Sequence, residues 1–252
     1  MYNELFDKLS TNKKYRDVCP DTMRRVIAEC EGRYKKAKDT EKAVREKLHG
    51  ITSAFMSEQE YKKAQALAGE FCPENLEELL ACHASTRERL PLAAMDTLYA
   101  RIFDVTGIPE TLLDLACGIN PVYFIGKYPG MQVTGADISG QSVNIITRCG
   151  GRALHNDLLC ADSVPAERFD VALLFKILPL LDRQRSGTAT DVLNRINAGH
   201  IVCSFPTRTL GGRNVGMEEN YSSWMESHIP EKYSACARFT TENELYYILK
   251  ES

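Results

Sequence analysis

Three aspartates occupy positions where the ends of neighbouring strands would bring acid groups together. Asp114, Asp137 and Asp157 each end or directly follow a short apolar run. Open α/β sheets bind their ligands at the carboxyl ends of parallel strands, which meet at one edge. A single aspartate after a strand is usually a turn or helix cap. Three in succession instead favour a site for an amino group, ribose hydroxyls and an adenine amine.

The turn after Asp114 narrows the choice of ligand. It reads A-C-G-I-N-P and holds one glycine, Gly118. A dinucleotide site needs G-x-G-x-x-G here, so that backbone amides can approach the diphosphate. Asp137 follows Gly118 by 19 residues, close to the spacing of an acid that binds ribose. The pattern disfavours an NAD oxidoreductase and indicates S-adenosylmethionine, which carries a sulfonium charge and no phosphate.

The segment after the fourth expected strand indicates the kind of methyl acceptor. Enzymes that methylate amino groups commonly carry Asn/Asp-Pro-Pro-aromatic there, but residues 173–181 read LLFKILPLL. No general base is evident either, because Asp182 is better explained as the cap of the next helix. An acceptor with a free lone pair needs no base. Guanine N7, exposed beside O6, is such an acceptor.

A glycine-rich stretch, SFPTRTLGGRNVGMEENYSSWME at 204–226, follows the fifth expected strand. Its position predicts that it lies over the cofactor edge of the sheet. Arg208 and Arg213 could hold phosphate or O6 of a flipped base. Tyr221 and Trp224 are better explained as residues of the core.

The chain changes character near residue 105. Before it, helix signals dominate, including possible capping boxes at Ser57–Glu60 and Ser85–Glu88. After it, apolar runs alternate with helices, which predicts a mostly parallel sheet with helices on both faces and an antiparallel hairpin at one edge. The expected strands are 111–116, 131–137, 151–155, 169–175, 199–204, 232–239 and 244–250. The expected helices of this half are 121–128, 139–149, 183–197 and 217–227.

Composition excludes several classes of protein. The 252 residues carry a net charge of −3 and contain no apolar run long enough to span a membrane. The N-terminus lacks the apolar region of a signal peptide. The nine cysteines include no C-x-x-C pair, and no histidine lies near them at ligand spacing. These features predict a cytoplasmic protein with reduced thiols, no metal site and no membrane partner.

Charge is unevenly distributed along the helical part. Residues 13–50 hold twelve Lys or Arg against seven Asp or Glu, a net charge of +5. A solvated helical face is the simpler explanation of such a stretch. A phosphate-binding surface is the alternative, because released counterions favour such contacts.

Together these stretches resemble the aminoglycoside-resistance 16S rRNA methyltransferases of the Arm/Rmt type, which methylate guanine N7. The matching segments are KKYRDVCPDTMRRV (13–26), KLHG (47–50), HASTRERL (83–90), DLACGINP (114–121), LLFKILPLL (173–181) and the stretch 204–226, with a weaker match to the end of the chain. The resemblance implies a class I S-adenosylmethionine-dependent fold with a seven-stranded sheet at 106–252. Residues 1–105 would form a helical rRNA-docking domain and a cofactor-flanking helix.

The family's substrate is the guanine at position 1405 of 16S rRNA in the assembled 30S subunit, where N7 methylation blocks gentamicin and kanamycin. The resemblance thus implies S-adenosylmethionine as cofactor, 16S rRNA in the 30S subunit as partner, no DNA partner, and a monomer. Two alternatives stay open: the same fold acting on another guanine, such as one in tRNA, and an inactive RNA-binding module that keeps the cofactor fold.

The resemblance also implies roles for individual residues. The cofactor-binding residues would be His83, Thr86, Arg87, Asp114, Ala116, Gly118, Asp137, Ile138, Asp157, Leu158 and Phe175. Lys176, Arg208 and Met217 would act at the reacting centre. The rRNA-binding residues would be Lys13, Lys14, Arg16, Arg24, Arg25, Lys47 and Arg213. One departure is Val215, where family members often carry a basic residue.

Overall fold

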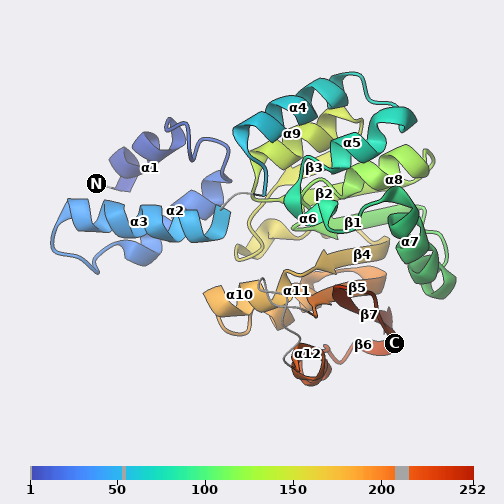
Figure 1. The fold of residues 1–252 in the computed structure, drawn as a ribbon. Helices are drawn as coiled ribbons and strands as arrows, with labels where there is room; N and C mark the ends of the chain where they lie inside the picture. Colours follow the sequence, from blue (N-terminus) through green and yellow to red (C-terminus); the bar gives the residue numbers. More distant parts are fainter. Residues whose placement is uncertain (1, 53–54, 208–215) are drawn as a thin grey trace.

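A single seven-stranded sheet organises most of the molecule (Figure 1). The computed structural model describes residues 2–52, 55–207 and 216–252. The strands are β1 (Thr111–Leu115), β2 (Gln132–Asp137), β3 (Arg152–His155), β4 (Phe169–Phe175), β5 (Ala198–Pro206), β6 (Tyr233–Thr240) and β7 (Glu244–Glu251). Their order is β3-β2-β1-β4-β5-β7-β6, with β1 to β5 parallel and β7 antiparallel to both β5 and β6. The strand order reverses between β1 and β4, so the ligand site of such a sheet is expected at their carboxyl ends.

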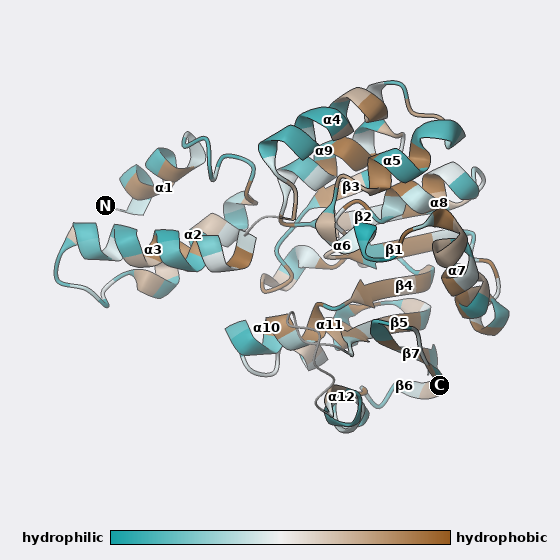
Figure 2. Ribbon diagram, viewed as in Figure 1, coloured by the Kyte–Doolittle hydropathy of each residue, from teal (hydrophilic) through white to brown (hydrophobic). Residues whose placement is uncertain are grey.

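Helices cover both faces of the sheet. One hydrophobic core joins strand residues such as Leu112 and Leu173 to helices α4 (Glu58–Gly69), α5 (Leu76–Leu80), α7 (Leu92–Thr106), α8 (Pro121–Lys127) and α9 (Gly140–Arg148). The alternate strand residues, such as Leu113 and Leu174, form a second core with α10 (Leu178–Gln184), α11 (Thr188–Arg195) and α12 (Met217–Glu226). Alternation of this kind buries both faces of the strands, and Figure 2 shows β1 and β4 as hydrophobic ribbons.

The first three helices form a unit with its own core, which we call the N-terminal unit (residues 2–52). It comprises α1 (Tyr2–Ser10), α2 (Pro20–Cys30) and α3 (Ala37–Thr52), packed around Met23, Val26 and Leu48 among others. Figure 1 shows the unit projecting to one side of the sheet. Helices α4, α5 and α7 instead share the core of the sheet. The packing therefore divides the helical part near residue 52, well before the boundary at 105 that the sequence suggests.

The seven strands and the antiparallel hairpin agree with the sequence-based expectation. The capping box at Ser57–Glu60 is confirmed, since both of its hydrogen bonds form. The one at Ser85–Glu88 is wrong: Ser85 lies inside the short helix α6 (Ala84–Arg87). The helix expected at 183–197 is wrong at its start: α10 already begins at Leu178 and ends at Gln184, and Gly187, in a left-handed conformation, separates it from α11.

All nine cysteines lie in the described part of the chain and are free thiols; six of them are buried. Within those same residues, no helix is long and apolar enough to cross a membrane.

Candidate active site

Asp114 is buried at the end of β1 beneath the turn that follows it. Asn120 donates a hydrogen bond to its Oδ2 at 2.7 Å, and Tyr99 in turn donates to Asn120 Oδ1 at 2.6 Å. Burial raises the pKa of Asp114 to about 7, although the Asn120 hydrogen bond and the charge of Arg89 act in the opposite direction. A carboxyl held in this way gains strongly from a cationic partner, such as an ammonium group.

The turn itself is tightly constrained. Ala116 and Gly118 both have positive φ, 54° and 55°. A Cβ at Gly118 would lie 2.4 Å from Cε1 of His83, so only glycine fits beside this ring. The Gly118 amide donates to Asp137 Oδ2 at 2.8 Å, and the Ser139 amide donates to Oδ1 at 2.7 Å. Asp137 is thus fixed at the end of β2, with one of these amides on each carboxylate oxygen.

The His83 ring packs against this turn at Gly118. It is buried, stacks on Phe55 with ring centroids 5.5 Å apart, and lies 3.4 Å from the Thr86 hydroxyl through Nδ1. Burial lowers the pKa of His83 to about 4, helped by the charges of Arg89 and Arg87. The imidazole is therefore neutral at physiological pH, and its uncharged ring borders the turn beside Gly118.

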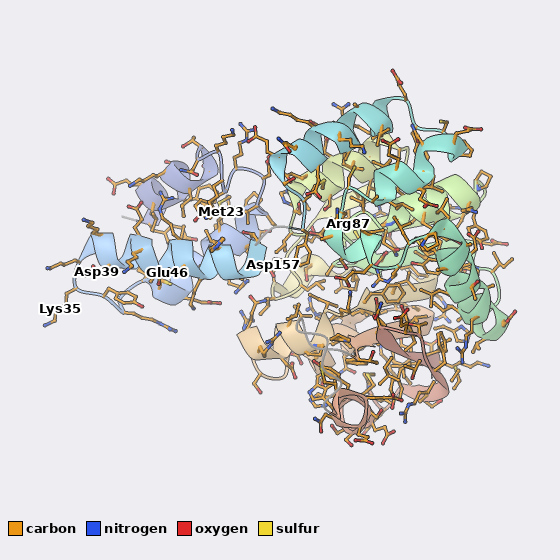
Figure 3. The ribbon with its side chains drawn as sticks, in the orientation of Figure 1. Met23, Lys35, Asp39, Glu46, Arg87 and Asp157 are labelled. Carbon is orange, nitrogen blue, oxygen red and sulfur yellow. The ribbon has the colours of Figure 1, made fainter. Side chains whose placement is uncertain are left out.

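Arg87, expected to bind the cofactor carboxylate, lies half-exposed near the centre of the molecule (Figure 3). It donates to Glu60 Oε1 at 2.9 Å and to the Ala81 carbonyl at 3.0 Å. The Ser57 backbone hydrogen bond and Arg87 lower the pKa of Glu60 to about 2. A carboxylate ligand of Arg87 would therefore compete with Glu60.

An ionic cluster lies at the carboxyl end of β4, and no local pattern in the sequence predicts most of it. Lys176 has a φ of 57° and pairs with Glu88 and, at 3.5 Å, with Glu244. Glu244 also pairs with Arg89 at 3.1 Å; the two side chains are 4% and 6% exposed. The Arg89 guanidinium lies 4.7 Å from the ring centroid of Phe175.

Glu244 also accepts hydrogen bonds from Ser204 at 2.7 Å and Tyr246 at 3.0 Å. Burial by itself would raise the pKa of Glu244, but the charges of Arg89 and Lys176 outweigh it and lower that pKa. The cluster thus fixes Phe175 and Lys176 beside the cofactor edge. Arg89 and Glu244 are 155 residues apart in the sequence, so no local sequence pattern could predict that they pair.

Both carboxylate oxygens of Asp157, which the sequence predicts to bind an adenine amine, already accept hydrogen bonds within the protein. Its Oδ2 accepts from Arg25 Nε at 2.9 Å, and its Oδ1 accepts from the Leu159 amide at 2.9 Å. Arg25 belongs to α2 of the N-terminal unit, and Figure 3 shows Asp157 at the junction of that unit with the rest of the molecule. The buried residue Leu158 follows, and its carbonyl accepts from Arg195 at 2.7 Å.

Most of the expected rRNA-binding side chains are exposed on the N-terminal unit, but several already have acidic partners. Lys13 pairs with Glu58 at 2.9 Å and Lys47 with Glu29 at 3.0 Å. Arg16 and Arg24 pair more loosely with Asp17 and Asp21, and Lys14 lies over the Tyr15 ring. Arg25 differs from all of these, because its side chain is only 10% exposed.

The remaining expected residues lie around the same edge. The Ile138 carbonyl follows Asp137 and accepts from Cys19 at 2.8 Å. Met217 begins α12, whose Tyr221 stacks on Phe205 and whose Trp224 also packs on Phe205. Asp182 lies inside α10 rather than at the start of the next helix, but its side chain accepts from the Ala189 amide in the first turn of α11 at 2.8 Å. Arg208 and Arg213 lie outside the described residues.

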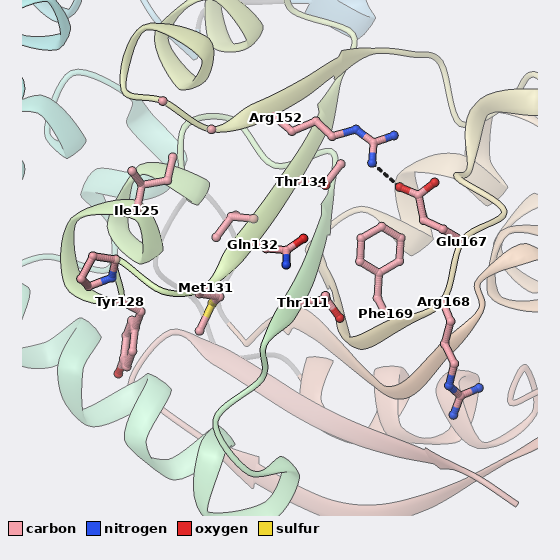
Figure 4. A pocket seen from close by; sticks show the side chains of 14 residues that line it. Thr111, Ile125, Tyr128, Met131, Gln132, Thr134, Arg152, Glu167, Arg168 and Phe169 are labelled. Atoms are coloured by element: carbon pink, nitrogen blue, oxygen red, sulfur yellow. Dashed lines mark hydrogen bonds and ion pairs between the residues drawn. The ribbon is translucent and has the colours of Figure 1, made fainter.

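The first residues of β1 to β4 line a separate pocket of about 600 Å³ (Figure 4). Arg152 and Glu167 form an ion pair at its rim. It lies at the opposite end of the strands from Asp114 and Asp137 and holds none of the expected site residues.

The arrangement fits S-adenosylmethionine. Two acids stand at adjacent strand ends: Asp114, which is buried and has no ion pair among the residues that the structure describes, and Asp137, which two backbone amides hold. Between them, only glycine fits at position 118. Within the described residues, no group of His, Cys, Asp and Glu side chains could hold a metal ion.

The comparison with known proteins decides the family. Residues 11–248 match the model of the ribosomal RNA methyltransferases called FmrO. The chain belongs to this family. A 16S rRNA (guanine(1405)-N(7))-methyltransferase from Serratia marcescens is 40% identical over 259 residues, covering 99% of this chain and 98% of the relative. One from Micromonospora echinospora is 33% identical, covering 96% of this chain and 94% of the relative.

Solved structures agree. The 16S rRNA methyltransferase RmtF in complex with S-adenosyl-L-homocysteine superimposes with a TM-score of 0.87 at 40% identity, covering 100% of this chain and 98% of that one. The 16S rRNA methylase RmtB gives 0.88 at 35% identity, covering 100% and 99%. The expected family, fold and cofactor are therefore confirmed: this FmrO-family chain is an S-adenosylmethionine-dependent rRNA methyltransferase. The roles of its individual residues stay predictions.

Proposed function

We propose that this chain methylates N7 of guanine 1405 of 16S rRNA in the assembled 30S subunit and thereby confers resistance to aminoglycosides of the gentamicin and kanamycin type. The observation that carries the proposal is full-length identity of 40% to a relative with that named activity. The site supports it, because Asp114 and Asp137 are both present at adjacent strand ends and are held there by hydrogen bonds from Asn120 and Gly118.

The residues would act mainly by positioning. When bound, S-adenosylmethionine supplies an electrophilic methyl group on its sulfonium sulfur. Asp114 would hold the ammonium group and Asp137 the ribose hydroxyls. Phe175 and Lys176, fixed by the cluster around Glu244, would border the guanine. Guanine N7 has a free lone pair, so orientation and exclusion of water can supply much of the rate without a base.

The exposed basic side chains of the N-terminal unit would dock on the rRNA. Lys13, Lys14, Arg16, Arg24 and Lys47 lie on a unit that projects from the sheet (Figure 1), so they can reach a surface beyond the reacting base. Such a surface would favour a folded subunit over naked rRNA.

The test offers methyl-labelled S-adenosylmethionine to purified 30S subunits, 50S subunits, naked 16S rRNA and tRNA, and maps the modified base. We expect label on N7 of guanine 1405, in 30S subunits alone. Label on tRNA would favour the other guanine substrate. Cofactor binding without label on any RNA would contradict the proposal and favour the inactive RNA-binding module.

A further inference from the structure

The N-terminal unit joins the rest of the molecule at the loops that follow β2 and β3. The Cys19 amide donates to the Ile138 carbonyl at 2.8 Å, and the Gly140 amide donates to the Asp17 carbonyl at 2.6 Å. Val18 and Ser139 form an antiparallel bridge between these two contacts. The segment before α2 thus pairs with the backbone directly after Asp137.

A second attachment runs through the side chain of Arg25. Its Nε donates to Asp157 at 2.9 Å, one terminal nitrogen donates to Glu29 at 2.9 Å, and the other donates to Gln184 of α10 at 3.3 Å. The Asp157 side chain is 3% exposed. Glu29 continues the chain of contacts to Lys47 on α3 at 3.0 Å.

This environment does not suit a phosphate contact. Arg25 is largely buried and already pairs with two carboxylates, whereas its neighbour Arg24 is 53% exposed, pairs with Asp21 at 3.1 Å and lies over the Phe6 ring. Burial alone would lower the pKa of Arg25, but Asp157 and Glu29 raise it, so the guanidinium stays charged and paired. Removing it would leave the buried Asp157 side chain without its ionic partner and with only the Leu159 amide as a donor, which destabilises the loop that carries it.

That loop is expected to form the adenine side of the cofactor site, next to Leu158. We propose that Arg25 is a positioning residue that fixes the loop after β3 from within the N-terminal unit, so that cofactor binding and 30S docking are coupled. The cofactor part of this inference needs only the family's cofactor, while the docking part rests on the proposed function. Coupling of this kind is reciprocal, so cofactor would tighten 30S binding by the factor by which 30S tightens cofactor binding.

The test compares Arg25→Ala and Arg25→Lys with Arg24→Ala, after thermal melting has shown that each is folded. Calorimetry with S-adenosylhomocysteine gives cofactor affinity, and 30S binding is measured with and without that ligand over a range of salt concentrations. For Arg25→Ala we expect cofactor affinity to fall by roughly 5-fold or more, and the cofactor-dependent gain in 30S affinity to disappear. Arg25→Lys should recover part of both, because it restores the charge beside Asp157.

Arg24→Ala should behave differently. As an exposed phosphate contact it would leave cofactor affinity unchanged and reduce the salt dependence of 30S binding by about one ion. The inference is overturned if Arg25→Ala shows this same behaviour, with cofactor affinity within about twofold of the unsubstituted protein. If the unsubstituted protein fails to bind 30S subunits, the proposed function fails, and the cofactor measurement still tests the role of Arg25.

Discussion

Asp114 sits in an environment that favours its protonated form, and this has a consequence for cofactor binding. Its folded-state pKa of about 7 lies above the ordinary value of 3.8. In the ligand-free protein its contribution to stability is therefore present below about pH 4 and is lost as the pH rises to about 7. A bound ammonium group reverses this preference, because it pairs with the ionised carboxylate.

We therefore predict that affinity for S-adenosylmethionine rises between pH 5.5 and 7, by at most about 10-fold per unit. Calorimetry at several pH values would measure it. Asp114→Asn should bind weakly and show little pH dependence in this range, and His83 adds none above pH 6 because burial keeps it neutral. A wild-type affinity that stays flat would contradict the assignment of Asp114 to the ammonium group.

Gly118 carries a separate prediction. Gly118→Ala should destabilise the fold by about 1–3 kcal/mol, because its φ of 55° strains any side chain and its Cβ would meet His83. Cofactor affinity should fall with it, since the Gly118 amide orients Asp137. Gly130→Ala is the matched control, because nothing lies within 4 Å of a Cβ there. Denaturant unfolding and calorimetry would measure both effects, and equal losses from the two substitutions would exclude this explanation.

Strand β7 carries both a buried and an exposed glutamate that form ion pairs, which makes it a test of burial at the scale of an element. Glu244 pairs with Arg89 inside the molecule, while Glu251 pairs with Arg168 at 2.7 Å with side chains 36% and 58% exposed. Glu244→Gln should cost about 3–5 kcal/mol of unfolding free energy, because Arg89 is left buried with its charge uncompensated. Glu251→Gln should cost less than about 1 kcal/mol. Urea unfolding compares them, and similar values would contradict the burial argument.

The elements also show what the sequence could and could not predict. Apolar runs marked the central strands β1, β4 and β5, because strands buried on both faces read as continuous hydrophobic segments. The break between α10 and α11 was missed, since Gly187 alone does not reveal its left-handed backbone. Asp114 and Asp137 could be found because strand ends place them. Arg89 and Glu244 could not, because their pairing depends on β7 lying beside β5. The burial of Arg25 beside Asp157 could not be predicted either, because it depends on how α2 packs against the loop after β3.

At the scale of the whole molecule, the N-terminal unit and the sheet present different surfaces to an RNA. Replacing Lys14 and Arg16 together with Ala should weaken 30S binding and lower its salt dependence by about two ions. The cofactor affinity should not change. Arg152→Ala is the control, because Arg152 lies at the opposite end of the strands (Figure 4). Binding measured at several salt concentrations checks this, and an equal effect from Arg152→Ala would argue against a docking surface on the N-terminal unit.

Strand β7 lies between β5 and β6, although it is the last of the seven strands to be translated. Synthesis proceeds from the N-terminus, so the N-terminal unit and β1 to β5 emerge from a ribosome before the strand that completes the sheet. Glu244 arrives with β7, and until then Arg89 lacks its carboxylate and Phe175 lacks the cluster that fixes it. A nascent chain therefore cannot complete the ion-pair cluster at the carboxyl end of β4 while β7 is still in the exit tunnel.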